Sequence, residues 1–236
     1  MGRLYLQQLL KVRPFNKMVV FSNTQEILSE TLIWVQFTTA LVALYHFPKL
    51  KKGYWKWFIV YCCAIFFMEA FAKWGLKNYP LYISKYYDFF VIPLEFVFFY
   101  WLYAIKSLNR LKLFWITTSL FCVSFLPYFT IIHKPGMMLS LSYTVGTVLL
   151  MFLVILEIFK QIKSEKILLF HTNYMFYINI GIMLFYVGTL PFFSFYNLLL
   201  NEPNLWSNYY TFFLIANHLM YLLFTAAFIW GKPNIY

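Results

Sequence analysis

The chain has 236 residues, of which 62% are hydrophobic, 24% aromatic and only 11% charged, and its net charge is +11. Soluble domains contain roughly 45–50% apolar and about 25% charged residues, so this composition excludes a disordered chain and an ordinary water-soluble enzyme. Because the basic residues cluster between long apolar runs, the positive charge indicates membrane topology rather than nucleic-acid binding.

Apolar runs follow one another along the chain, and each is long enough to cross a bilayer, which takes about 20 largely apolar residues. Short turns rich in proline, glycine and asparagine separate these runs. The sequence therefore predicts an all-α, polytopic membrane protein, with an N-terminal segment at 1–28 and a seven-helix transmembrane domain at 29–236. The seven predicted spans are 29–47, 55–76, 86–105, 112–132, 137–160, 173–199 and 206–230.

The loops expected on one side of the membrane carry most of the basic residues. Eleven Lys and Arg lie in the loops after the first, third and fifth spans and in the C-terminal tail, against three on the opposite side. The eleven are Lys49, Lys51, Lys52, Lys56, Lys106, Arg110, Lys112, Lys160, Lys163, Lys166 and Lys232, and the three are Lys77, Lys85 and Lys134. Since retained loops are rich in Lys and Arg, this bias predicts a cytoplasmic C-terminus and an external N-terminus.

Four basic residues before Met18 disagree with this orientation, because they fall on the external side. Two explanations remain open. The segment is either a short amphipathic helix on the membrane surface, or an extension of the reading frame before a native start at Met18. The four residues are Arg3, Lys11, Arg13 and Lys17.

Ionisable side chains inside the predicted spans are the main functional signal, because each costs about 2.5–3.5 kcal/mol at the centre of a bilayer. The helical rise places five of them between the midplane and the outer surface, namely Glu69, Lys73, Asp88, Glu95 and His218. We therefore predict an outward-facing polar pocket between the second, third and seventh spans. Its candidate ligand-binding residues are Glu69, Lys73, Asp88, Glu95, Asn217 and His218.

Glu95 carries the sharpest expectation. It lies close to the midplane, and the stretch Ile92-Pro93-Leu94-Glu95-Phe96 offers it no local partner. A buried carboxylate must be neutralised, paired or hydrated. His218 has the same predicted depth, so we expect the two side chains to lie within reach of each other at the floor of the pocket.

A structural interpretation competes with the pocket for most of these residues. Glu69 and Lys73 can form an i, i+4 ion pair, and Asp88 lies near the interface, where it can pair with Lys73 or be solvated. His218 can simply form a hydrogen bond between helices. We interpret Glu157, near the inner end of the fifth span, as structural, with Lys160 or Lys163 as its partner.

Familiar catalytic signatures are absent from the sequence. There is no His-Glu-x-x-His, Gly-x-Ser-x-Gly, Walker or EF-hand motif. The sequence thus assigns no catalytic residue, no metal site and no cofactor. Tyr and Trp residues at span ends, such as Tyr86-Tyr87 and Tyr100-Trp101, predict interfacial belts rather than a binding site.

The stretch from Asn78 to Tyr100, with Asn78-x-x-Leu81 and Ile92-Pro93-Leu94-Glu95-Phe96, resembles small seven-helix inner-membrane proteins of Bacteroidota-type bacteria. Those proteins are similar to the seven-helix input modules of some histidine kinases. The resemblance implies a multi-pass protein of the bacterial inner membrane with a sensory role. This sequence includes no cytoplasmic signalling domain, so we expect signalling to need a separate partner.

Three function classes follow. The leading one is a non-enzymatic sensor or accessory subunit that binds a small ligand, a lipid or a partner protein from the outer side. The second is an intramembrane enzyme for a lipid or polyprenyl substrate, with Glu95 and His218 as acid and base. The third is a structural subunit of a larger membrane complex. In each case the lipid bilayer is the environment, a membrane protein is the expected partner, and nucleic acid is not.

Overall fold

The computed structural model describes residues 22–51, 53–76, 78–127, 137–163, 172–199 and 202–232. The segment up to residue 21, with its two open explanations, lies outside the described residues, as do Lys52, Lys77, Lys134 and Lys166. Within the described ranges every regular element is a helix, and an isolated bridge joins Asn173 to Lys232. The all-α prediction is therefore confirmed.

The α-helices fall into long and short elements. The long ones are α2 (Asn23–Tyr45), α4 (Trp55–Ala70), α6 (Ile92–Tyr100), α7 (Leu111–Val123), α9 (Met137–Lys163), α10 (Tyr174–Ile182) and α13 (Pro203–Trp230). The short ones are α3 (Phe47–Leu50), α5 (Pro80–Tyr86), α11 (Gly188–Ser194) and α12 (Tyr196–Leu199).

Turns of π-helix join several of these elements into continuous helices. They are η1 (Phe71–Gly75), η2 (Tyr87–Val91), η3 (Trp101–Ser107) and η5 (Met183–Val187). A π turn widens the helix, and such turns are rare and frequently lie at functional sites. Here η2 immediately precedes Pro93, whose missing N–H already interrupts the hydrogen-bond ladder. The sixth predicted span is therefore irregular near its centre, and the third is irregular near both of its ends.

Six helices are long and apolar enough to cross a membrane. They are Asn23–Tyr45, Trp55–Gly75, Tyr87–Ser107, Leu141–Lys163, Tyr174–Ser194 and Pro203–Trp230. They match six of the seven predicted spans and fit a multi-pass membrane protein. The predicted fourth span, 112–132, contains the shorter apolar helix α7, and residues 128–136 lie outside the described part. The count of seven, like the orientation, stays a prediction.

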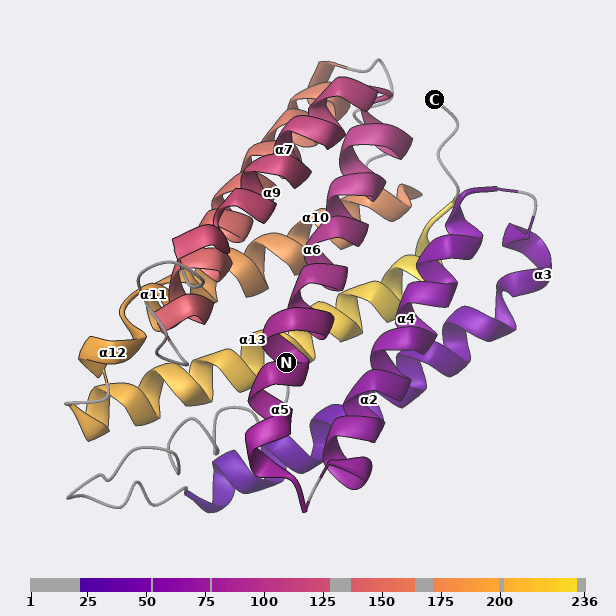
Figure 1. The fold of residues 1–236 in the computed structure, drawn as a ribbon. Coiled ribbons are helices and arrows are strands. Elements are labelled where there is room, and N and C mark those ends of the chain that lie inside the picture. Colours follow the sequence, from indigo (N-terminus) through magenta and orange to yellow (C-terminus); the bar gives the residue numbers. More distant parts are fainter. Residues whose placement is uncertain are drawn as a thin grey trace.

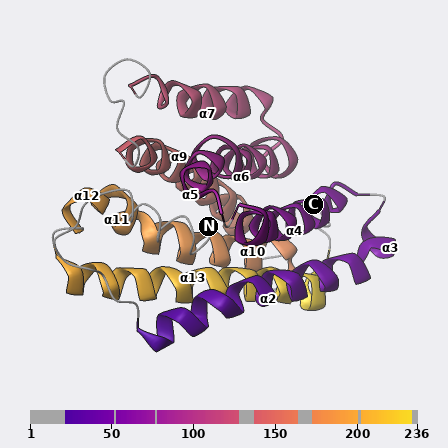
Figure 2. The same ribbon diagram turned by 60° about the horizontal axis from the view of Figure 1, so that its bottom comes forward.

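The helices form a layered bundle. Figure 2 shows α7 along one side and α2 with α13 along the opposite side, with α6, α9, α4, α10 and α11 between them. Helix α13 packs against α2, α10 and α11, and α9 packs against α6, α7 and α11. Consecutive long helices run in opposite directions in Figure 1, as expected for short connections between membrane spans.

The outer surface of the bundle is apolar. Large side chains such as Trp34, Phe67 and Trp115 are 61%, 67% and 60% exposed. Soluble proteins rarely expose contiguous apolar surface on this scale. The exposed apolar surface therefore supports a lipid environment for these helices.

Hydrogen bonds between side chains connect α2 to α13. The Gln25 amide, part of the capping box with Ser22 that begins α2, donates to Thr211 Oγ1 at 2.9 Å. Thr39 Oγ1 lies 2.9 Å from Thr225 Oγ1 further along the same pair of helices. Such bonds contribute about 0.6 kcal/mol each between membrane helices, so they fix the register of α2 on α13.

Candidate polar site in the membrane core

Glu95 is buried inside the bundle with a tyrosine as its hydrogen-bond donor. The residue is 6% exposed, and the Tyr61 hydroxyl of α4 donates to Glu95 Oε1 at 3.0 Å. The Tyr61 ring stacks on Phe98 of α6, with centroids 4.2 Å apart and planes 3° from parallel. Stacking of this kind holds the hydroxyl in place toward the carboxylate.

Three further buried tyrosines surround this pair. Glu95 lies within electrostatic range of the hydroxyls of Tyr143, Tyr186 and Tyr221, which come from α9, η5 and α13. The Tyr143 hydroxyl lies 3.2 Å from Thr189 Oγ1. The Tyr186 hydroxyl has no hydrogen-bond partner in the described part of the chain, and the Tyr221 hydroxyl faces the Gln36 side chain of α2. The Tyr186 hydroxyl, near a membrane-buried carboxylate, can therefore form a further hydrogen bond.

Asn217 and Gln36 extend this polar region toward α2. Asn217 is fully buried one turn before Tyr221 on α13, and neither its amide nitrogen nor its oxygen has a partner among the described residues. Gln36 of α2 lies beside Tyr221, and its amide nitrogen is also without a partner there. Each buried polar group without a partner costs about 1–3 kcal/mol. We name the set Glu95, Tyr61, Tyr186, Tyr221, Asn217 and Gln36 the core polar cluster.

The core polar cluster lies near the middle of the membrane-length helices. Tyr61, Glu95 and Tyr186 are each within a few residues of the centre of Trp55–Gly75, Tyr87–Ser107 and Tyr174–Ser194. Asn217 lies at the centre of Pro203–Trp230, and Tyr221 lies one turn after it. The concentration of polar groups is thus at the depth where desolvation costs most.

Glu69 and Asp88 lie on the adjacent turns. The Tyr87 hydroxyl of η2 donates to Glu69 Oε2 at 2.8 Å, and both Glu69 and Asp88 are buried. Lys73 is half-buried and lies over the Trp74 ring, 5.8 Å from its centroid. No ion pair joins Lys73 to Glu69 or Asp88 within the described ranges. Lys73 lies in the π turn η1, whereas Glu69 belongs to the regular helix α4.

His218 does not reach the core polar cluster. Its Nε2 lies 3.0 Å from Thr31 Oγ1 on α2 and its Nδ1 lies 2.8 Å from the Leu214 carbonyl. No hydrogen bond or ion pair connects it to Glu95 in the described part of the chain. Adjacent helical residues point about 100° apart. Asn217 therefore faces the core, and His218 faces α2, which removes the expected contact between His218 and Glu95.

No protein-family model, curated protein or solved structure matches this chain. The resemblance to seven-helix sensor proteins of bacterial inner membranes therefore stays a prediction.

Tyrosines are the residues that sequence reasoning missed. Tyr87 and Tyr100 were expected at the interface, and that expectation is wrong, because both are buried and bond to Glu69 and to the Gly146 carbonyl. Tyr186 and Tyr221 lie in the middle of predicted spans. A tyrosine far from a span end was the available signal, since its hydroxyl needs a partner at membrane depth.

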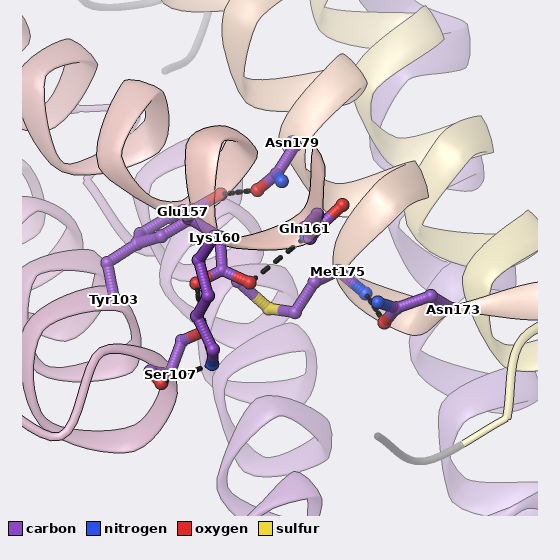
Figure 3. Close-up of polar contacts among 8 residues, drawn as sticks. All are labelled: Tyr103, Ser107, Glu157, Lys160, Gln161, Asn173, Met175 and Asn179. Carbon is purple, nitrogen blue, oxygen red and sulfur yellow. Dashed lines mark hydrogen bonds and ion pairs between the residues drawn. The ribbon is translucent and has the colours of Figure 1, made fainter. Parts of the chain in front are cut away.

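A second buried cluster lies where η3 meets the C-terminal end of α9 (Figure 3). Glu157 is fully buried; it accepts a hydrogen bond from the Ser107 hydroxyl and one from Gln161 Nε2 at 3.0 Å. Lys160 Nζ lies 4.0 Å from Glu157 Oε2 and donates to the Ser107 carbonyl at 2.6 Å. Lys160 is therefore the partner of Glu157, as the structural interpretation allowed, and the carboxylate joins two helices instead of extending to the surface.

Tyr54 and Tyr103 are close to this second cluster. Burial raises the pKa of the Tyr54 hydroxyl well above its usual range, and the nearby charge of Glu157 raises that pKa further. The Tyr103 hydroxyl donates to Asn179 Oδ1 at 2.7 Å, which connects η3 to α10.

The described residues contain no group of three His, Cys, Asp or Glu side chains that could hold a metal ion.

Proposed function

We propose that this protein is an integral membrane sensor or accessory subunit that binds a small cationic or hydrogen-bonding ligand at the core polar cluster. The observation that carries the proposal is the presence of buried polar groups without hydrogen-bond partners around Glu95. Its carboxylate has one hydrogen-bond donor, and the nearby Tyr186 hydroxyl and Asn217 amide have no hydrogen-bond partner in the described ranges. Native proteins rarely leave such groups unsatisfied without a bound molecule or a functional reason.

The chemistry of the cluster defines the ligand class. A carboxylate at membrane depth favours a cation or a strong hydrogen-bond donor. The amide and two hydroxyls offer both donors and acceptors. The tyrosine rings provide apolar and cation-π contacts. An amine, or a compact polyhydroxylated molecule, fits these properties better than an anion does.

The local helix geometry supports movement on binding. Two π turns, η2 and η5, lie one to two turns from Glu95 and at Tyr186. Single π turns inside α-helices are rare and occur frequently at functional sites. We propose that ligand binding shifts these turns and that the shift is passed to a partner protein.

The enzyme alternative is no longer supported by its proposed acid–base pair. It relied on Glu95 and His218 as an acid–base pair, and these side chains bond to Tyr61 and to Thr31 instead. The structural-subunit alternative remains, because the apolar outer surface can contact either lipid or another protein.

The test is recovery of the ligand. The full chain is extracted from membranes in polymer nanodiscs without detergent, and its bound small molecules are identified by mass spectrometry. We expect a molecule in near-stoichiometric amount in the wild type and at least about tenfold less in Glu95→Gln and in Tyr186→Phe combined with Tyr221→Phe. The control is Glu30→Gln, which changes an exposed carboxylate of α2.

Two results would overturn the proposal. In the first, wild type and Glu95→Gln carry the same bound molecules. In the second, the wild type carries no stoichiometric molecule. A stable partner protein that is retained equally by both variants, without a small molecule, favours the structural-subunit alternative.

A further inference from the structure

We propose that the groove between the η3–α7 turn and the C-terminal end of α9 binds the phosphate of an anionic phospholipid. This inference is independent of the function proposed for Glu95. The groove encloses about 490 Å³ and is lined by Leu108, Arg110, Leu156, Phe159, Lys160 and Lys163. Three of the six lining residues are cationic and none is acidic.

The backbone on one side of the groove is fixed by a tight turn. Asn109 has a positive φ of 54°, a conformation that asparagine tolerates better than most residues. The Arg110 N–H donates to the Ala104 carbonyl at 2.7 Å, and the Arg110 carbonyl accepts from Leu113 at 3.1 Å as α7 begins. The exposed Arg110 side chain therefore extends from an ordered backbone.

Lys160 and Lys163 supply the charge on the other side. Lys160 Nζ bonds to the Ser107 carbonyl and lies 4.0 Å from Glu157, so part of its charge is already compensated. Lys163, one turn later on α9, is exposed. Glu157 is fully buried and occupied by Ser107 and Gln161. The groove thus keeps a net positive charge, principally from Arg110 and Lys163.

The apolar surface next to the groove argues for a lipid rather than a free phosphate. On α9, Phe152, Ile155, Phe159 and Ile162 are 49%, 46%, 56% and 53% exposed and follow helical spacing away from the cations. Across the groove, Leu111 and Trp115 of α7 are also exposed. A phospholipid matches both parts, with its phosphate at Arg110 and Lys163 and its acyl chains along these side chains. Basic pockets between membrane helices bind anionic head groups in this way.

The charge bias supports the same occupant. Arg110, Lys160 and Lys163 belong to the loops that the sequence predicts on the cytoplasmic side. Anionic phospholipids attract basic residues next to membrane helices by a few-fold in affinity per residue. Two such residues acting together predict a combined effect of about 30-fold.

The experiment measures lipid binding to the purified full chain by native mass spectrometry. The probes are phosphatidylglycerol, phosphatidylcholine and inorganic phosphate, each added to delipidated protein in the same detergent. We expect phosphatidylglycerol to bind at least about tenfold more tightly than phosphatidylcholine. The double variant Arg110→Gln with Lys163→Gln should lose about 30-fold in phosphatidylglycerol affinity.

The control variant removes the same charge elsewhere. Lys49→Gln with Lys51→Gln alters two exposed residues of the same predicted side that do not line the groove, and its phosphatidylglycerol affinity should stay within about twofold of wild type. Arg110→Lys with Lys163→Arg keeps the charge and should retain most of the binding. A loss of binding together with a changed gel-filtration profile would indicate that this variant is misfolded.

Three outcomes would overturn the proposal. The first is equal binding of phosphatidylglycerol and phosphatidylcholine. The second is an equal loss of affinity in the control variant. The third is binding of inorganic phosphate that is as tight as that of phosphatidylglycerol and equally sensitive to Arg110→Gln with Lys163→Gln, which would assign the groove to a free anion.

Discussion

The Tyr61 hydroxyl donates to Glu95 Oε1 at 3.0 Å and thereby joins α4 to α6 inside the bundle. The bond gives Glu95 a partner 34 residues earlier in the chain. A hydroxyl donor stabilises the carboxyl group without neutralising it, so the site remains receptive to a cation or a second donor.

Glu95→Gln should keep the fold, because the amide oxygen can still accept the Tyr61 hydrogen bond. Glu95→Leu should lose about 1–3 kcal/mol of stability, because it leaves the buried Tyr61 hydroxyl without an acceptor. Thermal unfolding in detergent, followed by intrinsic fluorescence, measures the difference. Equal melting temperatures for the two variants would contradict the role of this bond.

Asn217→Leu should change stability by less than about 1 kcal/mol, because removal of a buried amide without partners offsets the cost of a larger side chain of the same branched shape. The same variant should lose the ligand of the core polar cluster. The neighbouring change His218→Leu should retain the ligand and cost less than about 1 kcal/mol, since it removes one bond to Thr31. Ligand content and melting temperature of both variants check this pair, and ligand loss in His218→Leu alone would reverse the assignment.

Gly146→Ala should destabilise the bundle by about 1–3 kcal/mol, because overpacking forces neighbouring rings to move. A Cβ at Gly146 would lie 2.8 Å from the Phe96 ring and 3.0 Å from the Phe121 ring. The matched control is Gly53→Ala, whose Cβ would meet its nearest atom at 3.8 Å. The melting temperature should fall for Gly146→Ala only, and a similar fall in both variants would argue against close packing of α9 on α6.

Glu157→Leu should cost about 3 kcal/mol or more, because it leaves Ser107, Gln161 and Lys160 without their shared acceptor. Glu157→Gln should cost less, about 1 kcal/mol, since the amide oxygen can still accept a hydrogen bond. Both should retain the ligand of the core polar cluster. Urea-dependent unfolding in mixed micelles tests the order of the two variants.

The predicted orientation can be checked with single cysteines at Lys51 and Lys134 in a chain whose Cys62, Cys63 and Cys122 are replaced by alanine. A membrane-impermeant maleimide added to intact cells should label position 134 and leave position 51 unlabelled until the cells are opened. Labelling of position 51 from outside would reverse the topology.

The sequence by itself determined the membrane environment and the all-α fold class of this protein. The composition and the spacing of apolar runs predicted membrane helices, and six of them are present with boundaries close to those expected. This succeeds because hydrophobic length is a local property that needs no knowledge of neighbours. The sequence also identified Glu95 and Asn217 as groups too costly to face lipid, and both are buried.

Only the tertiary structure decided which of these polar groups meet. His218, the expected partner of Glu95, is adjacent to Asn217 and points about 100° away from it around the helix. The rotation of α13 about its axis, which the sequence does not give, therefore decides that His218 contacts Thr31 and not Glu95. The π turns η1 and η2 change the facing further, and no residue pattern signalled them. Tyr61, Tyr186 and Tyr221 gather around Glu95 because four helices pack there, and that packing depends on side chains from distant parts of the chain.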